Sequence, residues 1–384
     1  MTYFANRTIN RLYAHCALQS FAEYSGGLFV SAYLIKQGIS IPVVFLAVAG
    51  FVLLRMIFRQ SLMPFARTFG LRNALVAGSM LVGLGYVPLA FVQSIGLMLW
   101  LHLIIGAFGE SWYWSSFHAL SATYGDQERR GSQTSAVQLI YAVNFIAGPF
   151  LGGLLLTVFG PLAAFSVSGI AMVASTIPLL GAPNLALAEG RELRPDARRF
   201  ARRIYAADGF TGSITMIASR LALFLILGES FQSFGSALAF AGLFGAVLGL
   251  GLGKLIDNGH GQKSTPFAIG LGGFDVLFRS FAVANTVTAV AAQAFGAVIG
   301  PLYSSAYNSR VYNISKTSGD PLQFQIAGEG GWDMGAAAGA LLAAFLTWQA
   351  VAWPWIITMG LLGTGSALLI LSRSYSIGEP SLRL

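Results

Sequence analysis

The sequence predicts an all-α polytopic membrane protein, with twelve transmembrane helices arranged as two six-helix halves. Of its 384 residues, 55% are hydrophobic and only 10% are charged, which leaves too little polar surface to cover a soluble body of this size. Apolar runs of about 20 residues, the length that crosses a bilayer, alternate with short polar segments. These runs are too long for the weak alternation of barrel strands. They cover 12–35, 41–62, 73–94, 97–118, 133–156, 161–182, 206–228, 233–256, 265–285, 287–309, 323–347 and 352–372.

The amino terminus and the single cysteine narrow the remaining possibilities. The opening residues MTYFANRTINR are polar and lead into a full-length apolar run, so we expect the first helix to be retained rather than cleaved as a signal. Cys16 is the only cysteine, which leaves neither a disulfide framework nor a thiolate metal site. The sequence lacks H-E-x-x-H, G-x-S-x-G and a Walker loop. We therefore expect no enzyme activity, no catalytic residue, no metal and no cofactor.

The net charge of +8 follows the topology of the chain and gives little support to nucleic-acid binding. Lys36 is the only basic residue in a loop expected on the far side, and Arg220 and Arg279 lie inside predicted spans. The other lysines and arginines fall at the termini or in loops of one side, including the stretch 55–72 at the cytoplasmic end of the second span. This bias predicts a multi-pass protein of the inner membrane with both termini in the cytoplasm.

An arginine-rich loop at residues 184–205 divides the predicted spans into six and six. It separates an N-terminal half, 1–183, from a C-terminal half, 206–384. The loop is interpreted as a solvated linker that fixes orientation, and a short amphipathic helix on the anionic leaflet is the alternative.

The two halves share a weak internal repeat, as expected of transporters built from related halves. At an offset of 187 residues, the sequence AFG at 107–109 meets AFG at 294–296. Two glycine pairs align at the same offset on equivalent spans, which makes coincidence a poor explanation. These pairs are Gly148 with Gly335 and Gly152 with Gly339.

In span count, central loop and half-repeat, the whole chain resembles the major facilitator superfamily of secondary transporters. The loop after the second span resembles the family motif G-x-x-x-D-R-x-G-R-R and keeps Gly70 and Arg72, with the opening glycine and aspartate replaced. The corresponding loop of the second half keeps Gly253 and Asp257. In the family this element links helices on the cytoplasmic side and latches the outward-facing state. The resemblance implies this conformational role here, and capping of a helix end is the alternative for Asp257.

The fifth span contains NFIAGPFLGG, which resembles the G-x-x-x-G-P-x-x-G-G motif of proton-coupled exporters. Gly148, Pro149, Gly152 and Gly153 match the motif. Small residues let helices approach closely, and proline removes a backbone donor and permits a bend. The resemblance implies a gating role, and ordinary small-residue packing is the alternative.

Ionisable and polar groups within the spans mark the predicted substrate site. Each charged group costs about 2.5–3.5 kcal/mol to insert at the centre of a bilayer, so it should face a wet cavity or a partner. Residues four apart share a helix face, which gives stripes on the first, fourth and eleventh spans. In the family, the first, fourth, seventh and tenth helices line the cavity and the eleventh flanks it. The predicted substrate- and proton-binding residues are Gln19, Glu23, Glu110, Tyr113, Trp114, His118, Arg220, Glu329 and Asp333.

Glu110 is the strongest candidate because its half-repeat counterpart is Ala297, whereas the neighbouring glycine occurs in both halves. Burial favours the neutral form of a carboxyl group, which would let Glu23, Glu110 or Glu329 exchange a proton near neutral pH. Trp112 lies on the opposite face and is expected to pack as scaffold. A buried structural carboxylate is the alternative for Glu110.

Two arginines remain within the predicted spans. Asp275 and Arg279 lie four residues apart in the ninth span, so they are expected to form an internal ion pair. Arg220 has no such neighbour. It is expected to neutralise a carboxylate, and binding of an anionic group is the alternative.

These features predict a monomeric, proton-coupled secondary transporter that works by alternating access in contact with membrane lipids. The expected activity is antiport, with efflux of a small amphiphilic or cationic molecule. One alternative is uptake of a zwitterionic or anionic metabolite through Arg220. A non-transporting membrane receptor on the same scaffold is the alternative from another class.

Overall fold

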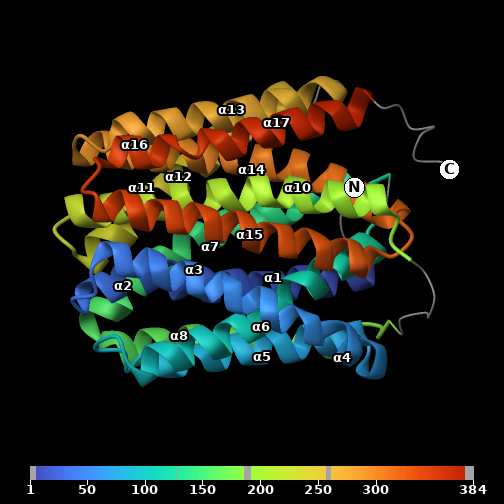
Figure 1. Cartoon of the computed structure of the whole chain (residues 1–384), viewed down its shortest axis with the longest axis horizontal. Helices are drawn as coiled ribbons and strands as arrows, with labels where there is room; N and C mark the ends of the chain where they lie inside the picture. The colour runs from blue at the N-terminus through green and yellow to red at the C-terminus, as the bar shows by residue number, and fades with distance from the viewer. Residues whose placement is uncertain (1–5, 127, 186–191, 257–260, 377–384) are drawn as a thin grey trace.

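The chain forms a bundle of helices that run side by side along one axis, as the computed structural model in Figure 1 shows. The structure describes residues 6–126, 128–185, 192–256 and 261–376, and these contain helices and turns but no strand. The start of α1 and the end of α17 lie at the same end of the bundle, called the termini end below. The elements up to residue 180 are α1 (Arg7–Ser25), η1 (Gly27–Phe29), α2 (Val30–Lys36), α3 (Ile41–Phe58), η2 (Arg59–Ser61), α4 (Leu62–Phe69), α5 (Leu71–Leu89), α6 (Leu97–Tyr124), α7 (Arg130–Val158), α8 (Gly160–Ala174) and α9 (Ile177–Leu180).

The rest of the chain repeats this pattern of long helices joined by short turns. Each of the twelve predicted ranges overlaps helix in the described part of the chain, although α5 ends at Leu89 and the range predicted for the third span runs to residue 94. The later elements are α10 (Pro195–Thr211), η3 (Gly212–Met216), α11 (Ile217–Ile226), α12 (Phe231–Ile256), α13 (Gly261–Ala282), α14 (Thr286–Thr317), α15 (Pro321–Trp348), α16 (Trp353–Thr358) and α17 (Leu361–Ser376).

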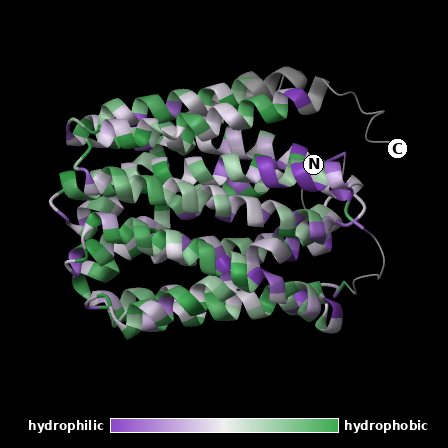
Figure 2. Ribbon diagram, in the orientation of Figure 1, coloured by the Kyte–Doolittle hydropathy of each residue, from purple (hydrophilic) through white to green (hydrophobic). Residues whose placement is uncertain are grey.

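Hydrophobic residues predominate along most of the length of the helices, and hydrophilic residues gather at the termini end (Figure 2). Large side chains such as Ile170, Phe281 and Val287 are 68%, 75% and 78% exposed. Apolar exposure on this scale fits lipid rather than water. Among the described residues, six helical segments are long and apolar enough to cross a membrane by length and composition. They are Ile41–Phe69, Gly131–Val158, Gly160–Leu180, Pro195–Ile226, Thr286–Thr317 and Trp353–Arg373.

The arginine-rich region after the first half contains the start of a spanning helix. Helix α10 begins at Pro195 and continues through η3 into α11, so residues 195–226 form one continuous segment. Residues 195–205, which the sequence assigns to the linker, are therefore the first turns of this segment rather than a helix lying along the surface. Pro195 starts the helix where its missing N–H costs nothing.

The glycines of the internal repeat occupy matching positions in helix packing. Gly109 places α6 against the backbone of α5, and Gly296 places α14 against α13. In the same way, Gly148 places α7 against α1, and Gly335 places α15 against α10. A side chain at any of these positions would collide with its neighbour, which explains why glycine recurs at this offset.

The two halves touch each other near both ends of the bundle. At the end opposite the termini, the Phe29 ring lies 6.4 Å from Phe231 and 5.6 Å from Phe234 between ring centroids. At the termini end, Lys316 Nζ donates a hydrogen bond of 2.8 Å to the carbonyl of Gly125. Polar side chains of both halves can meet in the space between these two end contacts.

Candidate substrate cavity and ion cluster

A cavity of about 720 Å³ lies between the halves and is lined by residues of both. Its volume is within the range of small-molecule sites, which are usually about 300–1,000 Å³. The lining comes chiefly from α1, α3, α6, α7, α10, α11, α14 and α15. Six predicted site residues line it: Glu23, Glu110, Trp114, His118, Arg220 and Glu329.

A buried ion cluster joins the halves beside this cavity. Arg55 on α3 lies at its centre, with Nη1 2.9 Å from Glu110 Oε2, Nη2 3.1 Å from Glu329 Oε2 and Nε 3.2 Å from Asp333 Oδ1. Arg59, one turn further on, also pairs with Asp333. Glu110 belongs to the first half, whereas Glu329 and Asp333 belong to α15, so the two arginines hold α3, α6 and α15 together. We call these five residues the ion cluster.

Sequence reasoning missed the two arginines of the ion cluster. It assigned the stretch 55–72 to the cytoplasmic end of the second span, but Arg55 and Arg59 are only 4% and 3% exposed. The positive-inside rule favours placing arginines in loops, and here their partners on α6 and α15 lie far away in sequence. The available signal was their spacing of four residues, which puts both guanidinium groups on one face of a strongly apolar helix.

His118 connects three helices at the edge of the cluster. Its Nδ1 atom lies 2.5 Å from the hydroxyl oxygen of Tyr312 on α14, and its Nε2 atom lies 3.5 Å from Glu329 Oε1 on α15. The Trp114 ring stacks on the imidazole at 5.4 Å between centroids. The predicted stripe Glu110, Trp114 and His118 thus lines the cavity from one face of α6, because residues four apart share a helix face.

Three predicted site residues lie away from the open cavity. Tyr113 is 1% exposed, packs against α5 and the His15 ring, and does not line the cavity. The reason is its position one residue before Trp114, which turns it about 100° around the helix. Gln19 is 1% exposed within α1, and Asp333 is fully buried in the ion cluster. Trp112 packs 4.3 Å from Phe65 as scaffold, as predicted.

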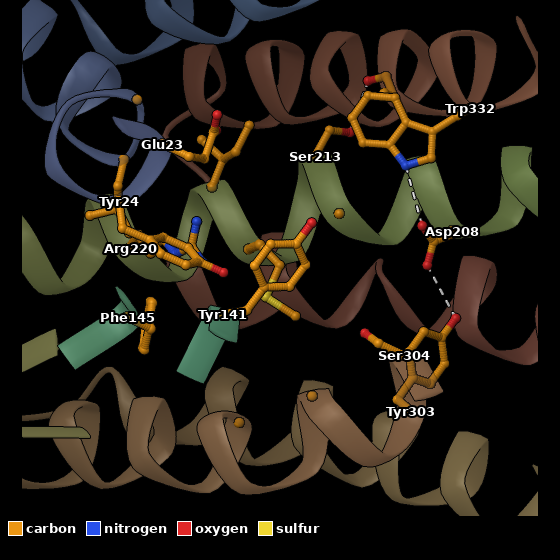
Figure 3. A pocket seen from close by; sticks show the side chains of 18 of the residues that line it. Glu23, Tyr24, Tyr141, Phe145, Asp208, Ser213, Arg220, Tyr303, Ser304 and Trp332 are labelled. Atoms are coloured by element: carbon orange, nitrogen blue, oxygen red, sulfur yellow. Dashed lines mark hydrogen bonds between the residues drawn. The ribbon is translucent and has the colours of Figure 1, made fainter. Parts of the chain in front are cut away.

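Glu23 and Arg220 line the cavity from opposite halves (Figure 3). Among the described residues, neither forms an ion pair within 4.0 Å. The predicted internal pair is confirmed: Arg279 Nε lies 2.8 Å from Asp275 Oδ2. Arg279 also donates to Gln293 on α14 and lines the cavity.

Asp208 is a cavity residue that the sequence analysis did not select. Its Oδ1 accepts a hydrogen bond of 3.2 Å from the Tyr303 hydroxyl, and its Oδ2 accepts one of 3.2 Å from Trp332 Nε1. Just beyond it, Gly212–Met216 form a π-helical turn, a distortion that is frequent at functional sites. The sequence places Asp208 at the start of the seventh predicted span, but the adjoining arginine-rich loop favoured a position at the membrane surface.

Of the residues with predicted conformational roles, Gly70 and Arg72 lie where α4, α5 and α9 meet. Gly70 has a positive φ of 85° at the turn between α4 and α5, where glycine is favoured. Arg72 donates to the carbonyls of Leu180 and Ala182, so it ties the start of α5 to the end of α9. Gly253 lies in α12, and Asp257 lies outside the described residues.

The predicted motif on α7 faces both halves of the bundle. Gly148 and Gly152 pack against α1, whereas Pro149 and Gly153 pack against α12 at Gly235. The backbones come close enough there that a Cβ on Gly235 would overlap the Pro149 carbonyl. The motif therefore lies where movement of one half against the other would require sliding.

A lipid-facing helical bundle with a polar cavity between two halves defines the class of multi-pass membrane transporters. The chain belongs to the Major Facilitator Superfamily, whose family description matches residues 16–319. In sequence, no curated protein matches the chain.

Solved structures share the fold over nearly the whole chain. A bacterial homologue of the iron transporter ferroportin in an outward-facing state matches with a TM-score of 0.68 and 14% identity, over 96% of this chain and 99% of that one. The human organic anion transporter MFSD10 (TETRAN) matches with a TM-score of 0.66 and 16% identity, over 95% and 99%. A POT family transporter in complex with 5-aminolevulinic acid gives 0.65 and 13%, over 98% and 97%. At these identities the likeness describes the fold.

Proposed function

We propose that this protein is a proton-coupled antiporter that exports a small cationic or amphiphilic organic molecule by alternating access. Its two halves, 1–183 and 206–384, alternate around the cavity, with both termini on the cytoplasmic side of the inner membrane. The chain acts as a monomer within membrane lipids. The observation that carries the proposal is the ion cluster, in which carboxylates of both halves share buried arginines beside the cavity.

The ion cluster has the composition needed for coupling. Arg55 contacts three carboxylates. If one of them takes up a proton, the arginine still forms ion pairs with the other two. Because Glu110 and Glu329 also line the cavity, a proton or a cationic substrate can reach them. Loss of one charge weakens the attraction between α3, α6 and α15, which frees the halves to move.

The remaining predicted residues have roles consistent with this mechanism. Glu23, Trp114 and Arg220 line the cavity and serve substrate or proton binding, and His118 connects Glu329 to α14. The close contacts at Gly70, Gly152 and Gly153 serve as conformational positions.

Arg220 supports a second candidate function. It lines the cavity, and no carboxylate of the described residues lies within 4.0 Å of it. A guanidinium in this position suits the carboxylate of a zwitterionic or anionic metabolite. Uptake of such a metabolite is therefore the alternative to export.

Transport in proteoliposomes tests the proposal. Purified protein is reconstituted with a pH-sensitive dye inside, and organic cations, zwitterions and anions are added in turn across an imposed pH gradient. We expect cations to dissipate the gradient in a protein-dependent way. Dissipation by anions or zwitterions alone would establish the alternative, and no response from any class would contradict proton-coupled transport.

Replacing Glu110 with Gln is expected to abolish proton-coupled transport while leaving folding near normal. The amide keeps the shape of the side chain and an acceptor for Arg55, but it cannot exchange a proton. Dye-reported proton flux and the elution profile of the purified variant measure the two effects. Glu192→Gln is the matched control, because that carboxylate is exposed and lies outside the cavity. Undiminished gradient-driven flux in Glu110→Gln would reassign Glu110 to a structural role.

A further inference from the structure

We propose that Asp208, Tyr303 and Trp332 form the binding site for the positively charged group of the substrate, an alkyl- or aryl-substituted ammonium. This inference rests on the proposed transport of an organic cation and identifies where that cation binds. The three residues come from α10, α14 and α15, so the site is assembled from the second half alone. Figure 3 shows them together at one end of the cavity, away from Glu23, Tyr24 and Arg220.

The charge of Asp208 is the first argument. Within the described residues it has no arginine, lysine or histidine in ion-pair distance, and its hydrogen-bond donors are a phenol and an indole. Glu329, the other acidic residue of the second half that lines the cavity, is compensated by Arg55. An intramembrane carboxylate without a counter-ion is costly, and a bound cation removes that cost.

The neighbouring groups argue for an organic cation rather than a metal ion. A hard metal ion requires several oxygen ligands, and no cluster of three or more metal-binding side chains occurs among the described residues. Asp208 instead accepts hydrogen bonds from two aromatic side chains, Tyr303 and Trp332. Two more rings follow Tyr303: it stacks on Tyr307 at 5.9 Å between centroids, and Tyr205 lies 6.0 Å from Tyr307. Aromatic faces beside a carboxylate are typical of sites that bind substituted ammonium groups.

The same tryptophan links this site to the ion cluster. Trp332 donates its N–H to Asp208, and the Cζ atom of Arg55 lies 5.0 Å from the centroid of its ring. A cation that binds Asp208 beside Trp332 comes close to the ring that Arg55 contacts, and two positive charges near one ring repel each other. Occupation of the site therefore weakens one contact that holds Arg55 in the cluster, which gives substrate binding a direct route to the contact between the halves.

Binding in detergent, without any gradient, tests the site separately from transport. The probe is benzyltrimethylammonium, and its neutral carbon isostere neopentylbenzene is the reference for shape and apolar contact. Isothermal titration calorimetry on the purified full chain should give measurable binding of the ammonium and much weaker binding of the isostere. In Asp208→Asn, affinity for the ammonium should fall by about tenfold or more, the effect of losing a charged hydrogen-bonding partner. Trp332→Phe should weaken it several-fold.

The controls distinguish the site from the proposed function. Asp196→Asn, which changes a carboxylate 60% exposed and outside the cavity, should bind as the unmodified protein does. Equal affinity of Asp208→Asn and the unmodified protein, or equal binding of probe and isostere, would overturn the site. The comparison of probe and isostere uses the unmodified protein, so it tests the site even if Asp208→Asn fails to fold. Ammonium binding without transport would instead overturn the proposed function alone.

Discussion

Replacing Arg55 with Met is expected to lower the free energy of unfolding by about 3–5 kcal/mol and to stop transport. The guanidinium is 4% exposed and contacts Glu110, Glu329 and Asp333. Methionine fills part of the same space, but it removes the arginine that contacts Glu110 and leaves Arg59 as the arginine beside the buried Glu329 and Asp333. Removal of one partner from a buried pair costs far more than the pair itself contributes, because the remaining charge stays desolvated.

Thermal unfolding of the purified variant in detergent, followed by tryptophan fluorescence, measures this loss, and dye-reported proton flux measures transport. Arg67→Met is the matched control, because Arg67 is an exposed arginine close by on α4. Its replacement should change stability by no more than about 0.5 kcal/mol. If Arg55→Met had the same melting temperature as Arg67→Met and the unmodified protein, the ion cluster would not hold the halves together.

Replacing Gly335 with Ala is expected to destabilise the protein by about 1–3 kcal/mol, the cost of overpacking a tight contact. In the structure, a Cβ atom at this position would overlap the carbonyl of Ala206, which belongs to the backbone of α10 and cannot rotate away. The two helices must then separate along a contact that includes Gly331 and Gly339. Separation also moves α15, which carries Glu329 and Asp333 to the ion cluster.

Gly365→Ala on α17 is the control for the change of residue type. A Cβ atom there meets nothing within 4 Å, and alanine favours helix by up to about 1 kcal/mol over glycine. The melting temperature in detergent should therefore fall for Gly335→Ala and stay or rise for Gly365→Ala. Equal melting of the two variants would show that close approach of α15 and α10 is not required.

The sequence predicted the helical class and the approximate ranges of the spans because hydropathy over about 20 residues reports the membrane directly. It also predicted the Asp275–Arg279 pair, since residues four apart on a helix meet without help from tertiary structure. The repeat offset predicted which glycines serve equivalent helix contacts.

The sequence did not place Arg55 and Arg59. Their partners lie 55 residues away or more, on helices whose relative rotation no local pattern specifies. Rotation around a helix also separated Tyr113 from Trp114, so one packs in the core and the other lines the cavity.

The sequence by itself determined that this chain is an all-helical membrane protein of related halves with Glu110 as an unusual intramembrane acid. Composition and periodicity suffice for that, because each helix must satisfy its own backbone in lipid. Only the tertiary structure decided which charges are compensated. In the folded protein Glu110 pairs with Arg55, whereas Asp208 accepts hydrogen bonds from two aromatic side chains. The sequence does not show this, because ion pairing depends on the distances between atoms of different helices.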